Sequence, residues 1–349
     1  MLNLTYNYKI KPTKEQIEKI EHNLNVCRSV WNYALAQRKL WYNSRSCDIS
    51  KCSIISEYIV PPFEYPTYHK QSSELTKAKK TNEFLKSGNA QAMQQTLRKL
   101  DRAFNDMKSK GLGFPRFKKR MKSFNLISNK IEINDKFIKM PLLQNVRFVT
   151  SRDIPDGFKI KQVQIIKKAS GYYANLALEL DVDIPTPQPH GHAIGIDVGI
   201  QSMLATSDGL TIKRPKFLDK VLRQIKLLQR VLKRKQKGSN NWKKLQKRIA
   251  LLHEKVANKR KDFHFKLAHQ LCQSAGMIFV EDINFNAWSK GMFSKQSLDM
   301  GLGQFFTILE YVCSQTDTYF AKVDKNYTSQ LCPNCGTHTG KKELNQRNH

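Results

Sequence analysis

A short apolar run near the middle of the chain, which ends in a carboxylate, constrains the fold most. Residues 193–197, Ala-Ile-Gly-Ile-Asp, have the composition of a buried strand, and Asp197 falls where that strand would end. A second apolar run, 277–280, leads into Glu281. Two strands that each carry an acid at one end commonly build a divalent-metal site for phosphodiester chemistry, because Mg²⁺ prefers oxygen ligands. The sequence therefore predicts an α/β domain with a divalent-metal site at Asp197 and Glu281.

The net charge of the chain indicates a polyanionic partner. The sequence has 60 Lys and Arg against 29 Asp and Glu, a formal charge of +31. An enzyme of small metabolites has no reason to carry that self-repulsion, whereas a nucleic-acid partner supplies one. An anionic membrane surface is the competing explanation, but no stretch approaches the ~18 consecutive apolar residues of a membrane span. The N-terminal residues also lack the pattern of a signal peptide. We therefore expect a cytoplasmic protein that does not contact a membrane.

The most basic segment lies between Lys213 and Lys261, where 19 Lys and Arg stand against two acids, a net charge of +17. Apolar residues recur every three or four positions on both sides of a turn at 238–241, which predicts an antiparallel helical hairpin over 215–272. A helix face that only contacts solvent would have balanced charges. The excess of positive charge therefore favours a surface that binds a phosphate backbone. The hairpin residues expected to bind nucleic acid are Lys233, Arg234, Lys235, Lys243, Lys244, Lys247, Arg248, Lys259, Arg260 and Lys261.

A second basic stretch, 111–120, reads Gly-Leu-Gly-Phe-Pro-Arg-Phe-Lys-Lys-Arg and breaks the preceding helical pattern. Aromatic residues interleaved with cations suit phosphate pairing combined with base stacking. A basic surface loop anchored by its two phenylalanines explains the stretch equally well, and the sequence leaves both interpretations open. Under the first interpretation, the nucleic-acid-binding residues are Arg116, Lys118, Lys119 and Arg120.

Changes of periodicity along the chain predict three domains. Residues 12–111 carry helical patterns on both sides of a turn-rich stretch, 44–73, to which we assign no regular structure. Residues 1–11 and 112–184 alternate as β-strands do, which predicts a β-barrel-like domain. A proline-rich linker then leads into the α/β domain, 190–349, which contains the helical hairpin.

The cysteines indicate an incomplete zinc site rather than a disulfide framework. The sequence has seven cysteines, an odd number, and five of them have no regular spacing. Cys332 and Cys335, in Cys-Pro-Asn-Cys-Gly, have the spacing of half a zinc ribbon over 326–349, but tetrahedral Zn²⁺ needs four ligands. His338 and His349 are the remaining candidates, and a terminal histidine is a poor ligand. We therefore expect Zn²⁺ binding to be weak or absent.

The order of elements in the last domain narrows the fold further. The pattern Gly-Ile-Asp-Val-Gly at 195–199, followed by two short strands and a later strand that ends in an acid, matches the ribonuclease H-like fold. In that fold, carboxylates from adjacent strands hold two Mg²⁺ ions roughly 4 Å apart. Actin-like sugar-kinase ATPases begin with a similar strand, but they have no need of so basic a hairpin, which disfavours that alternative.

Several motifs, taken in order, resemble the TnpB family of bacterial insertion sequences, also called OrfB. The motifs are Tyr-Lys-Ile-Lys-Pro-Thr-Lys-Glu-Gln at 8–16, Cys-Arg-Ser-Val-Trp-Asn at 27–32, Phe-Pro-Arg-Phe-Lys at 114–118, Gly-Ile-Asp-Val-Gly at 195–199, Val-Glu-Asp-Ile-Asn at 280–284, and Tyr-Thr-Ser-Gln-Leu-Cys-Pro-Asn-Cys-Gly at 327–336. The resemblance extends over nearly the whole chain. It implies an RNA-guided DNA endonuclease with a RuvC-like nuclease domain, whose guide RNA comes from the transposon end and whose target is double-stranded DNA.

Carried over to this sequence, the resemblance assigns roles to the predicted parts. Asp197 and Glu281 match the first and second catalytic carboxylates of the family. The helical domain corresponds to a recognition domain, and the β-rich domain to an oligonucleotide-binding-like wedge domain. The resemblance also implies Mg²⁺ and Zn²⁺ as metals, and a location at the bacterial nucleoid.

One departure from the family's pattern concerns the end of the sequence. The family continues with a second cysteine pair and a third catalytic aspartate, which residues 1–349 do not contain. Asp282 and Asp324 are poor substitutes, because Asp282 would point away from Glu281 and Asp324 belongs to the preceding strand. We therefore expect a C-terminally truncated copy that binds RNA and DNA but cleaves poorly. The alternatives are a nuclease-inactive guided repressor and a basic RNA-binding protein without guided activity.

Overall fold

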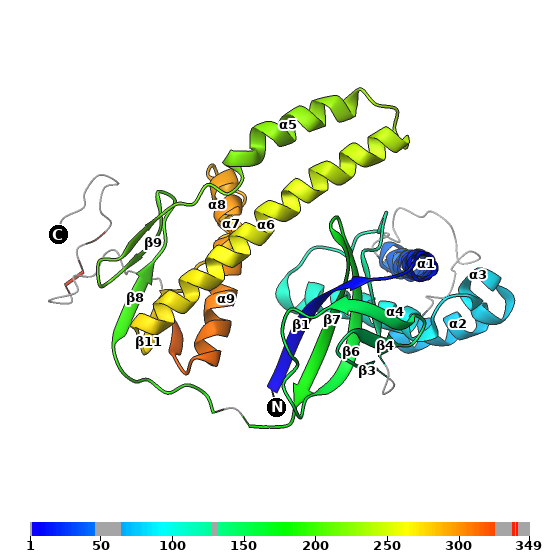
Figure 1. Cartoon of the computed structure of the whole chain (residues 1–349), viewed down its shortest axis with the longest axis horizontal. Helices are drawn as coiled ribbons and strands as arrows, with labels where there is room; N and C mark the ends of the chain where they lie inside the picture. The colour runs from blue at the N-terminus through cyan, green and yellow to red at the C-terminus, as the bar shows by residue number, and fades with distance from the viewer. Residues whose placement is uncertain are drawn as a thin grey trace, which may run out of the picture. The chain divides into compact units, whose positions relative to one another are not determined.

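The computed structural model describes residues 2–45, 64–127, 131–183 and 185–324, together with 337, 338 and 340. The chain divides into two compact units, Met1–Ile184 and Pro185–His349, each of which is described by itself (Figure 1). None of the described helices is both long and apolar enough to cross a membrane. The Cys332 and Cys335 motif lies outside the described residues.

A seven-stranded antiparallel sheet forms the core of the first unit. Strand β1 (Leu2–Lys11) lies between β7 (Gly171–Leu180) and β5 (Gln144–Val149), and the complete order is β2-β6-β7-β1-β5-β4-β3. The other strands are β2 (Ser123–Leu126), β3 (Glu132–Ile133), β4 (Phe137–Met140) and β6 (Lys159–Lys168). Alternate residues such as Tyr8 and Ile10 are buried, because one face of the sheet packs against helices.

The first unit contains an open sheet, so the prediction of a barrel-like domain is not confirmed. Its edge strands, β2 and β3, do not pair with each other in the part of the chain that the structure describes. Closure of a barrel requires the two edges to pair along their length, and β3 has only two residues. The prediction of an N-terminal strand within this sheet is confirmed, since β1 lies near the middle of it.

Four helices accompany the sheet: α1 (Lys14–Arg45), α2 (Tyr68–Thr81), α3 (Glu83–Lys86) and α4 (Ala90–Lys110). A capping box formed by Thr13 and Gln16 stabilises the start of α1. The Thr13 amide donates to Gln16 Oε1 at 3.0 Å, and the Gln16 amide donates to Thr13 Oγ1 at 3.3 Å.

The prediction that 44–73 has no regular structure is wrong at both ends. Helix α1 continues to Arg45, and α2 begins at Tyr68. Thr67 caps α2 by accepting a hydrogen bond from the Lys70 amide, and this capping signal was present in the sequence directly after Pro66. We predicted no helix here because several prolines precede Thr67.

A buried arginine joins the helices of the first unit. Arg38 is fully buried, and its guanidinium donates to Asp101 Oδ1 at 2.9 Å and to Gln71 Oε1 at 3.1 Å. It also lies 5.0 Å from the ring centroid of Phe104 and 5.4 Å from that of Tyr65. Asp101 is therefore the negative charge that compensates a guanidinium without access to water.

Asp101→Asn should destabilise the packing of α1 against α4 by about 3 kcal/mol, because it leaves the Arg38 charge buried and uncompensated. Asp106→Asn is the matched control, since Asp106 pairs with the largely exposed Lys110 on the same helix, and it should cost less than about 1 kcal/mol. Hydrogen exchange of the α1 and α4 amides measures both effects. Equal protection of these amides from exchange in the two variants would contradict the role of Asp101 as the counter-charge of Arg38.

A five-stranded sheet organises the second unit. Its order is β10-β9-β8-β11-β12, with β8 antiparallel to β9 and parallel to β11, and β11 parallel to β12. The strands are β8 (Ala193–Asp197), β9 (Ser202–Thr206), β10 (Thr211–Lys213), β11 (Met277–Glu281) and β12 (Tyr319–Val323). The predicted strands that end in Asp197 and Glu281, and the two short strands between them, are confirmed.

Helices α6 (Asn240–Ser274) and α9 (Leu302–Gln315) pack against each other beside this sheet (Figure 1). They enclose one apolar core with Ile194 and Ile278 of the strands. Two shorter helices, α7 (Phe285–Trp288) and α8 (Ser294–Met300), connect β11 to α9. The core thus buries one face of β8 and β11 and fixes which residues lie on the other face.

The predicted helical hairpin is confirmed. Helix α5 (Asp219–Lys233) runs back along the N-terminal half of α6, and the two are joined near Gly238, whose φ is +90°. The seam between them is only half-buried over most of its length, and Ile225 and Val256 are its buried members. Helix α6 then continues without a break into the core of the unit, so a single helix of 35 residues forms both the arm and the support of the sheet.

Candidate active site and basic surfaces

The structure brings the two predicted catalytic carboxylates to the same edge of the five-stranded sheet. Asp197 is the last residue of β8, and Glu281 is the last residue of β11. The two strands are parallel neighbours, with Val280 opposite Ile196, so the same register sets Glu281 opposite Asp197. Opposite residues of parallel neighbours point to the same face of a sheet. Because Ile196 and Val280 are buried in the helical core, both carboxylates belong to the face turned away from that core.

The sheet face that carries the carboxylates is open. Asp197 is exposed and Glu281 is half-buried. Gly195 precedes Asp197 by two residues and therefore lies on the same face, and a Cβ atom added to it would meet nothing within 4 Å. The lack of a side chain at Gly195 therefore leaves room for another backbone or a phosphate to approach closely.

The end of β8 is held in place by the turn that follows β9. The Gly195 amide donates to Ser207 Oγ at 3.1 Å, and the Ser207 amide donates to the Gly195 carbonyl at 3.0 Å. The neighbouring Asp208 carboxylate lies 2.7 Å from His192 Nε2. These contacts fix the backbone around Asp197 without using its carboxylate.

The two other acids considered from the sequence do not join this pair. Glu281 is opposite Val323 in the pairing of β11 with β12, so continued alternation places Asp282 and Asp324 on the opposite face from Glu281. Both are exposed. Among the described residues, no three His, Cys, Asp or Glu side chains form a group able to hold a metal ion. Of the predicted zinc ligands, only the exposed His338 lies within the described part of the chain.

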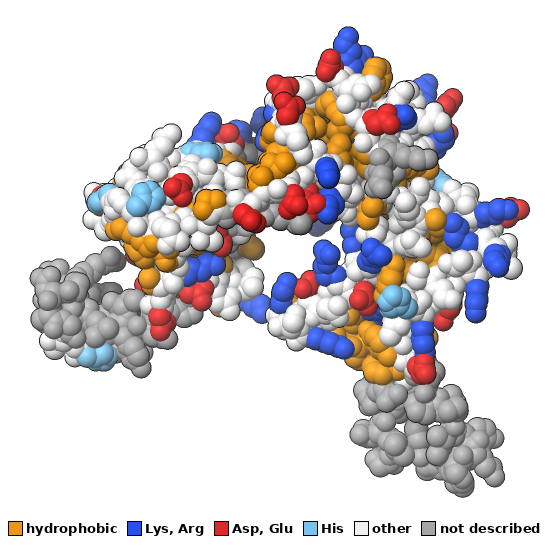
Figure 2. All heavy atoms as spheres, turned by 90° about the horizontal axis from the view of Figure 1, so that it is seen from below, with side chains coloured by type: hydrophobic (Ala, Val, Ile, Leu, Met, Phe, Trp, Pro, Cys, Tyr) orange, Lys and Arg blue, Asp and Glu red, His pale blue; other side chains and the backbone are white. Residues whose placement is uncertain are grey.

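The basic residues of the hairpin face solvent, with one exception. Lys and Arg side chains are spread over the molecular face shown in Figure 2, with Asp and Glu among them. The exposed hairpin residues are Lys233, Arg234, Lys235, Lys243, Lys244, Lys247, Arg248, Lys259 and Lys261. Arg260 differs, because its side chain is only 21% exposed and lies 3.5 Å from the buried carboxylate of Asp299. Its charge is therefore directed at the protein.

A buried polar cluster joins the base of the hairpin to the core, and sequence reasoning missed it. Asp299 in α8 is 4% exposed and accepts the backbone amide of Leu218, at the start of α5, at 3.1 Å. It also accepts from Arg260 of α6. One helical turn later, His264 Nε2 donates to the Met300 carbonyl at 3.0 Å. A lone Asp299 between Leu298 and Met300 gave no periodic signal that would have revealed this role.

The stability of this cluster should fall with acidification through His264. Burial, opposed by the hydrogen bond to the Met300 carbonyl, lowers the His264 pKa to about 4. In the unfolded chain, His264 binds a proton below about pH 6.5, whereas in the folded chain it does so only below about pH 4. The folded state is therefore most stable above pH 6.5 and loses stability as the pH falls. Between pH 7 and pH 5 the loss should be about 2 kcal/mol.

The measurement is thermal or denaturant unfolding of the wild type and of His264→Gln at both pH values. The variant keeps a donor for the Met300 carbonyl but does not titrate, so its unfolding should show less pH dependence than that of the wild type. An identical pH dependence in the two proteins would contradict the assignment.

The basic stretch 111–120 is an irregular segment clamped to α1 of the first unit. The Lys118 amide donates to Asn32 Oδ1 at 2.8 Å, and Asn32 Nδ2 donates back to the Lys118 carbonyl at 3.0 Å. Trp31 Nε1 donates to the Arg116 carbonyl at 3.1 Å. These contacts are made by the backbone of the segment and not by its side chains.

The two phenylalanines of the stretch have different surroundings. Phe114 makes edge contacts with Phe104 and Tyr42, at centroid distances of 5.3 and 5.7 Å, and anchors the segment. Phe117 is 51% exposed, and Lys39 Nζ lies 5.9 Å from its ring centroid. Arg116, Lys119 and Arg120 are exposed as well. The segment therefore has an anchor at one aromatic ring and an accessible ring among cations at the other, so each of the two interpretations describes part of it.

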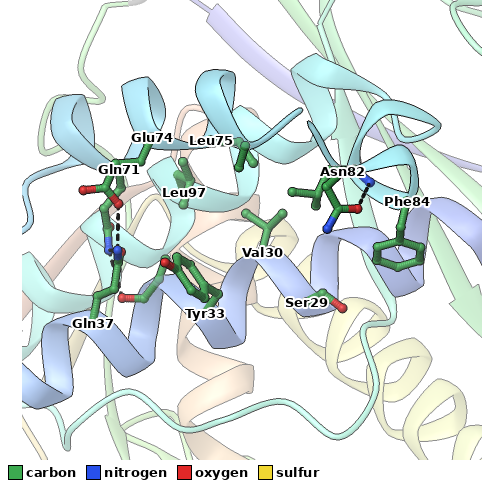
Figure 3. A pocket seen from close by; sticks show the side chains of 13 residues that line it. Ser29, Val30, Tyr33, Gln37, Gln71, Glu74, Leu75, Asn82, Phe84 and Leu97 are labelled. Atoms are coloured by element: carbon green, nitrogen blue, oxygen red, sulfur yellow. Dashed lines mark hydrogen bonds between the residues drawn. The ribbon is translucent and has the colours of Figure 1, made fainter. Parts of the chain in front are cut away.

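A cavity of about 410 Å³ lies between α1 and the helices α2 to α4 (Figure 3). Its wall is mostly apolar, and its polar end carries Gln37, whose amide donates to Glu74 Oε2 at 2.7 Å. The lining contains no lysine or arginine. Because a phosphate backbone needs cations, we do not assign this cavity to nucleic-acid binding.

Family models match three parts of the chain. A model of the OrfB_IS605 family described as "Probable transposase" matches residues 175–291, and the helix-turn-helix domain of the same family matches residues 1–47. A Cas12f1-like TNB domain matches residues 303–349. The chain is thus similar to the OrfB, or TnpB, family over residues 1–47 and 175–291. Within the OrfB match lie both Asp197 and Glu281, and the match named helix-turn-helix corresponds in the structure to β1 and α1.

Two proteins are similar to this chain over almost its full length. A protein of Streptomyces pristinaespiralis named "Putative RNA-guided DNA endonuclease" is 29% identical over 352 residues, which cover 98% of this chain and 83% of the relative. The Escherichia coli (strain K12) protein named "Putative RNA-guided DNA endonuclease InsQ" is 27% identical, over 96% of this chain and 84% of the relative. A solved Cas12f1 chain, from a complex with guide RNA and target DNA, superposes with a TM-score of 0.54 at 15% identity, over 95% of this chain and 78% of that one. The last comparison supports the same α/β fold.

Proposed function

We propose that this protein is a transposon-encoded, RNA-guided DNA-binding protein and endonuclease, and that Asp197 and Glu281 form its cleavage site. The observation that carries the proposal is the register of β8 and β11, which sets the two carboxylates opposite each other on one open face. The names of the two long relatives support the reaction class. The partners are then a guide RNA from the transposon end and a double-stranded DNA target, which meet in the bacterial cytoplasm at the nucleoid.

The proposal includes the finer domain assignment made from the sequence. The second unit would be a RuvC-like, ribonuclease H-like domain, consistent with its sheet order of three antiparallel strands followed by two parallel ones. The hairpin over 215–272 would be its insertion. In the first unit, 12–111 would act as the recognition domain, and 1–11 with 112–184 as the wedge.

The residues present fit a hard divalent cation such as Mg²⁺. Two carboxylates on a common sheet edge supply oxygen ligands, and without a cation their like charges would repel a phosphodiester. When bound, the cation supplies Lewis acidity at the scissile phosphate. Asp197 and Glu281 would hold it, and the space beside Gly195 would admit the nucleic-acid backbone. For Zn²⁺, Cys332 and Cys335 remain the proposed ligands of a half site, and the expectation of weak binding stays a prediction.

The test of function is to co-express the chain with the DNA that flanks its gene, purify the complex, and score binding and cleavage of matched target DNA separately. With Mg²⁺ present, binding and cleavage should both depend on the guide. Asp197→Asn and Glu281→Gln should lower cleavage by about 100-fold or more while leaving binding within a few-fold. Asp282→Asn and Asp324→Asn are matched controls, because these acids follow β11 and β12 and belong to the face opposite Glu281.

The outcomes separate the candidate functions. Unchanged cleavage in Asp197→Asn and Glu281→Gln would contradict the assigned site. Cleavage by residues 1–349 that is much slower than that of the two long relatives would support the prediction of impaired catalysis. Guide-dependent binding without cleavage would favour a guided repressor, and RNA binding without guide preference would favour a basic RNA-binding protein.

The hairpin should contribute phosphate contacts. The triple substitution Lys243→Gln, Lys244→Gln and Lys247→Gln should reduce the slope of log K against log salt by up to about 3, since each phosphate contact contributes close to one unit. The matched control replaces Lys77, Lys79 and Lys80 of α2, which removes the same charge elsewhere. Equal slopes for the two triple variants would show that only the net charge matters.

A further inference from the structure

Lys99, a lysine of the first unit, has no carboxylate partner among the residues that the structure describes. Lys99, on α4, is half-buried, and its ammonium donates to Asn125 Oδ1 of β2 at 2.7 Å. The charged groups that act on it are Lys118 and Arg102, both positive, besides the thiol of Cys27 on α1. A partly desolvated ammonium among other cations is unfavourable unless an anion approaches it.

The acceptor of Lys99 is built into the sheet. Asn125 is 8% exposed, and its Oδ1 also accepts from Gln164 Nε2 of β6 at 2.9 Å. Its Nδ2 donates to Gln162 Oε1 at 3.1 Å. This neutral amide network fixes the position of the Lys99 ammonium without neutralising it. An ammonium has three donors, and Asn125 uses one of them.

Lys118 completes the site from the clamped segment. Its Nζ lies 3.4 Å from the ring centroid of Trp31 on α1. Cys27, one turn earlier on α1, hydrogen-bonds to Thr96, one turn before Lys99 on α4. Helices α1 and α4 therefore bring Lys99 close to Lys118. The two hydrogen bonds between the Asn32 side chain and the Lys118 backbone hold Lys118 in place.

We propose that Lys99 and Lys118 together form a phosphate-binding site for one backbone phosphate of the nucleic acid that the protein carries. The inference rests on the proposed nucleic-acid function and adds to it a defined contact that the basic motifs alone do not identify. Two ammonium groups held by neutral partners match the charge and the several acceptor oxygens of a phosphodiester. Phe117, which is exposed and directly precedes Lys118, would stack on an adjacent base.

The alternative is that Lys99 only fills space and satisfies Asn125. Removing the charge of Lys99 distinguishes phosphate binding from this structural role. Lys99→Met keeps the aliphatic length and should reduce the salt slope of binding by about 1, with an affinity loss of about tenfold at moderate salt. Lys110→Met, on the same helix, removes the same charge from a lysine already paired with Asp106 and should leave both quantities near wild type. Lys99→Arg should restore the slope.

A second variant tests the site without removing a cation. Asn125→Asp is nearly isosteric and places a carboxylate 2.7 Å from Lys99. Rotation of the Gln162 side-chain amide lets its nitrogen donate to the second oxygen of the introduced carboxylate in place of the lost Asn125 donor. The melting temperature should then be equal or higher, because the ammonium gains a counter-charge, while binding weakens about tenfold, because the carboxylate competes with the phosphate. A purely structural Lys99 predicts higher stability with unchanged binding, which would overturn the proposal.

The pH dependence supplies an independent readout. Burial, followed by the charge of Lys118, lowers the Lys99 pKa to about 8, while the Cys27 thiol opposes and Arg102 reinforces this shift. A bound phosphate raises it again, so affinity should be greatest below pH 8 and should fall as the pH rises towards 9. Lys99→Arg stays protonated and should show a smaller fall. Equal falls in the two proteins would overturn the proposal.

The assay uses the full chain purified with its guide RNA, and measures guide RNA and target DNA in separate titrations. A defect of Lys99→Met confined to one titration identifies whether the phosphate belongs to RNA or DNA, and either result supports the site. Wild-type binding with no difference between Lys99→Met and Lys110→Met overturns the site alone. Failure of the wild type to bind any nucleic acid overturns both the site and the proposed function.

Discussion

The parallel pairing of β8 with β11 is the constraint on which the candidate active site depends. Neither strand carries a group of acids by itself, and Asp197 and Glu281 are 84 positions apart in the sequence. Burial of Ile194, Ile196 and Val280 against the helices determines which face of each strand is covered. A slip of one residue in either strand would send one carboxylate into that core, so the apolar contacts that stabilise the sheet also select the register of the site.

The second unit combines a rigid support and a cationic arm in one helix. The C-terminal half of α6 is buried through Leu267, Ala268 and Leu271, whereas its N-terminal half extends with α5 as the basic hairpin. The cluster around Asp299 joins the start of α5 to α6 and α8. The repulsion among the hairpin lysines therefore acts on an arm whose base is fixed by buried contacts, and a bound polyanion would relieve it.

Strong local patterns in the sequence predicted most of the elements, and weaker ones were missed. The capping box at Thr13 and the apolar periodicity of α4 and α6 were sufficient because local signals and tertiary packing agree there. Helix α2 was missed because prolines precede its Thr67 cap, and the barrel was wrong because strand patterns do not show whether the edges of a sheet meet. Asp197 and Glu281 were predicted because each ends an apolar strand. Asp299 and Lys99 were not, since their roles come from residues distant in the sequence.

A double-mutant cycle with Asp197→Asn and Glu281→Gln tests the central claim most directly. The quantity to measure is the rate of guided, Mg²⁺-dependent cleavage by the single and double variants, with DNA binding measured alongside. If the two carboxylates hold one cation, either single substitution should cost nearly as much as both together, because a site that has lost one ligand has little left to lose. If the decrease in the logarithm of the cleavage rate for the double variant equals the sum of the decreases for the two single variants, the two acids act independently, which would contradict the account.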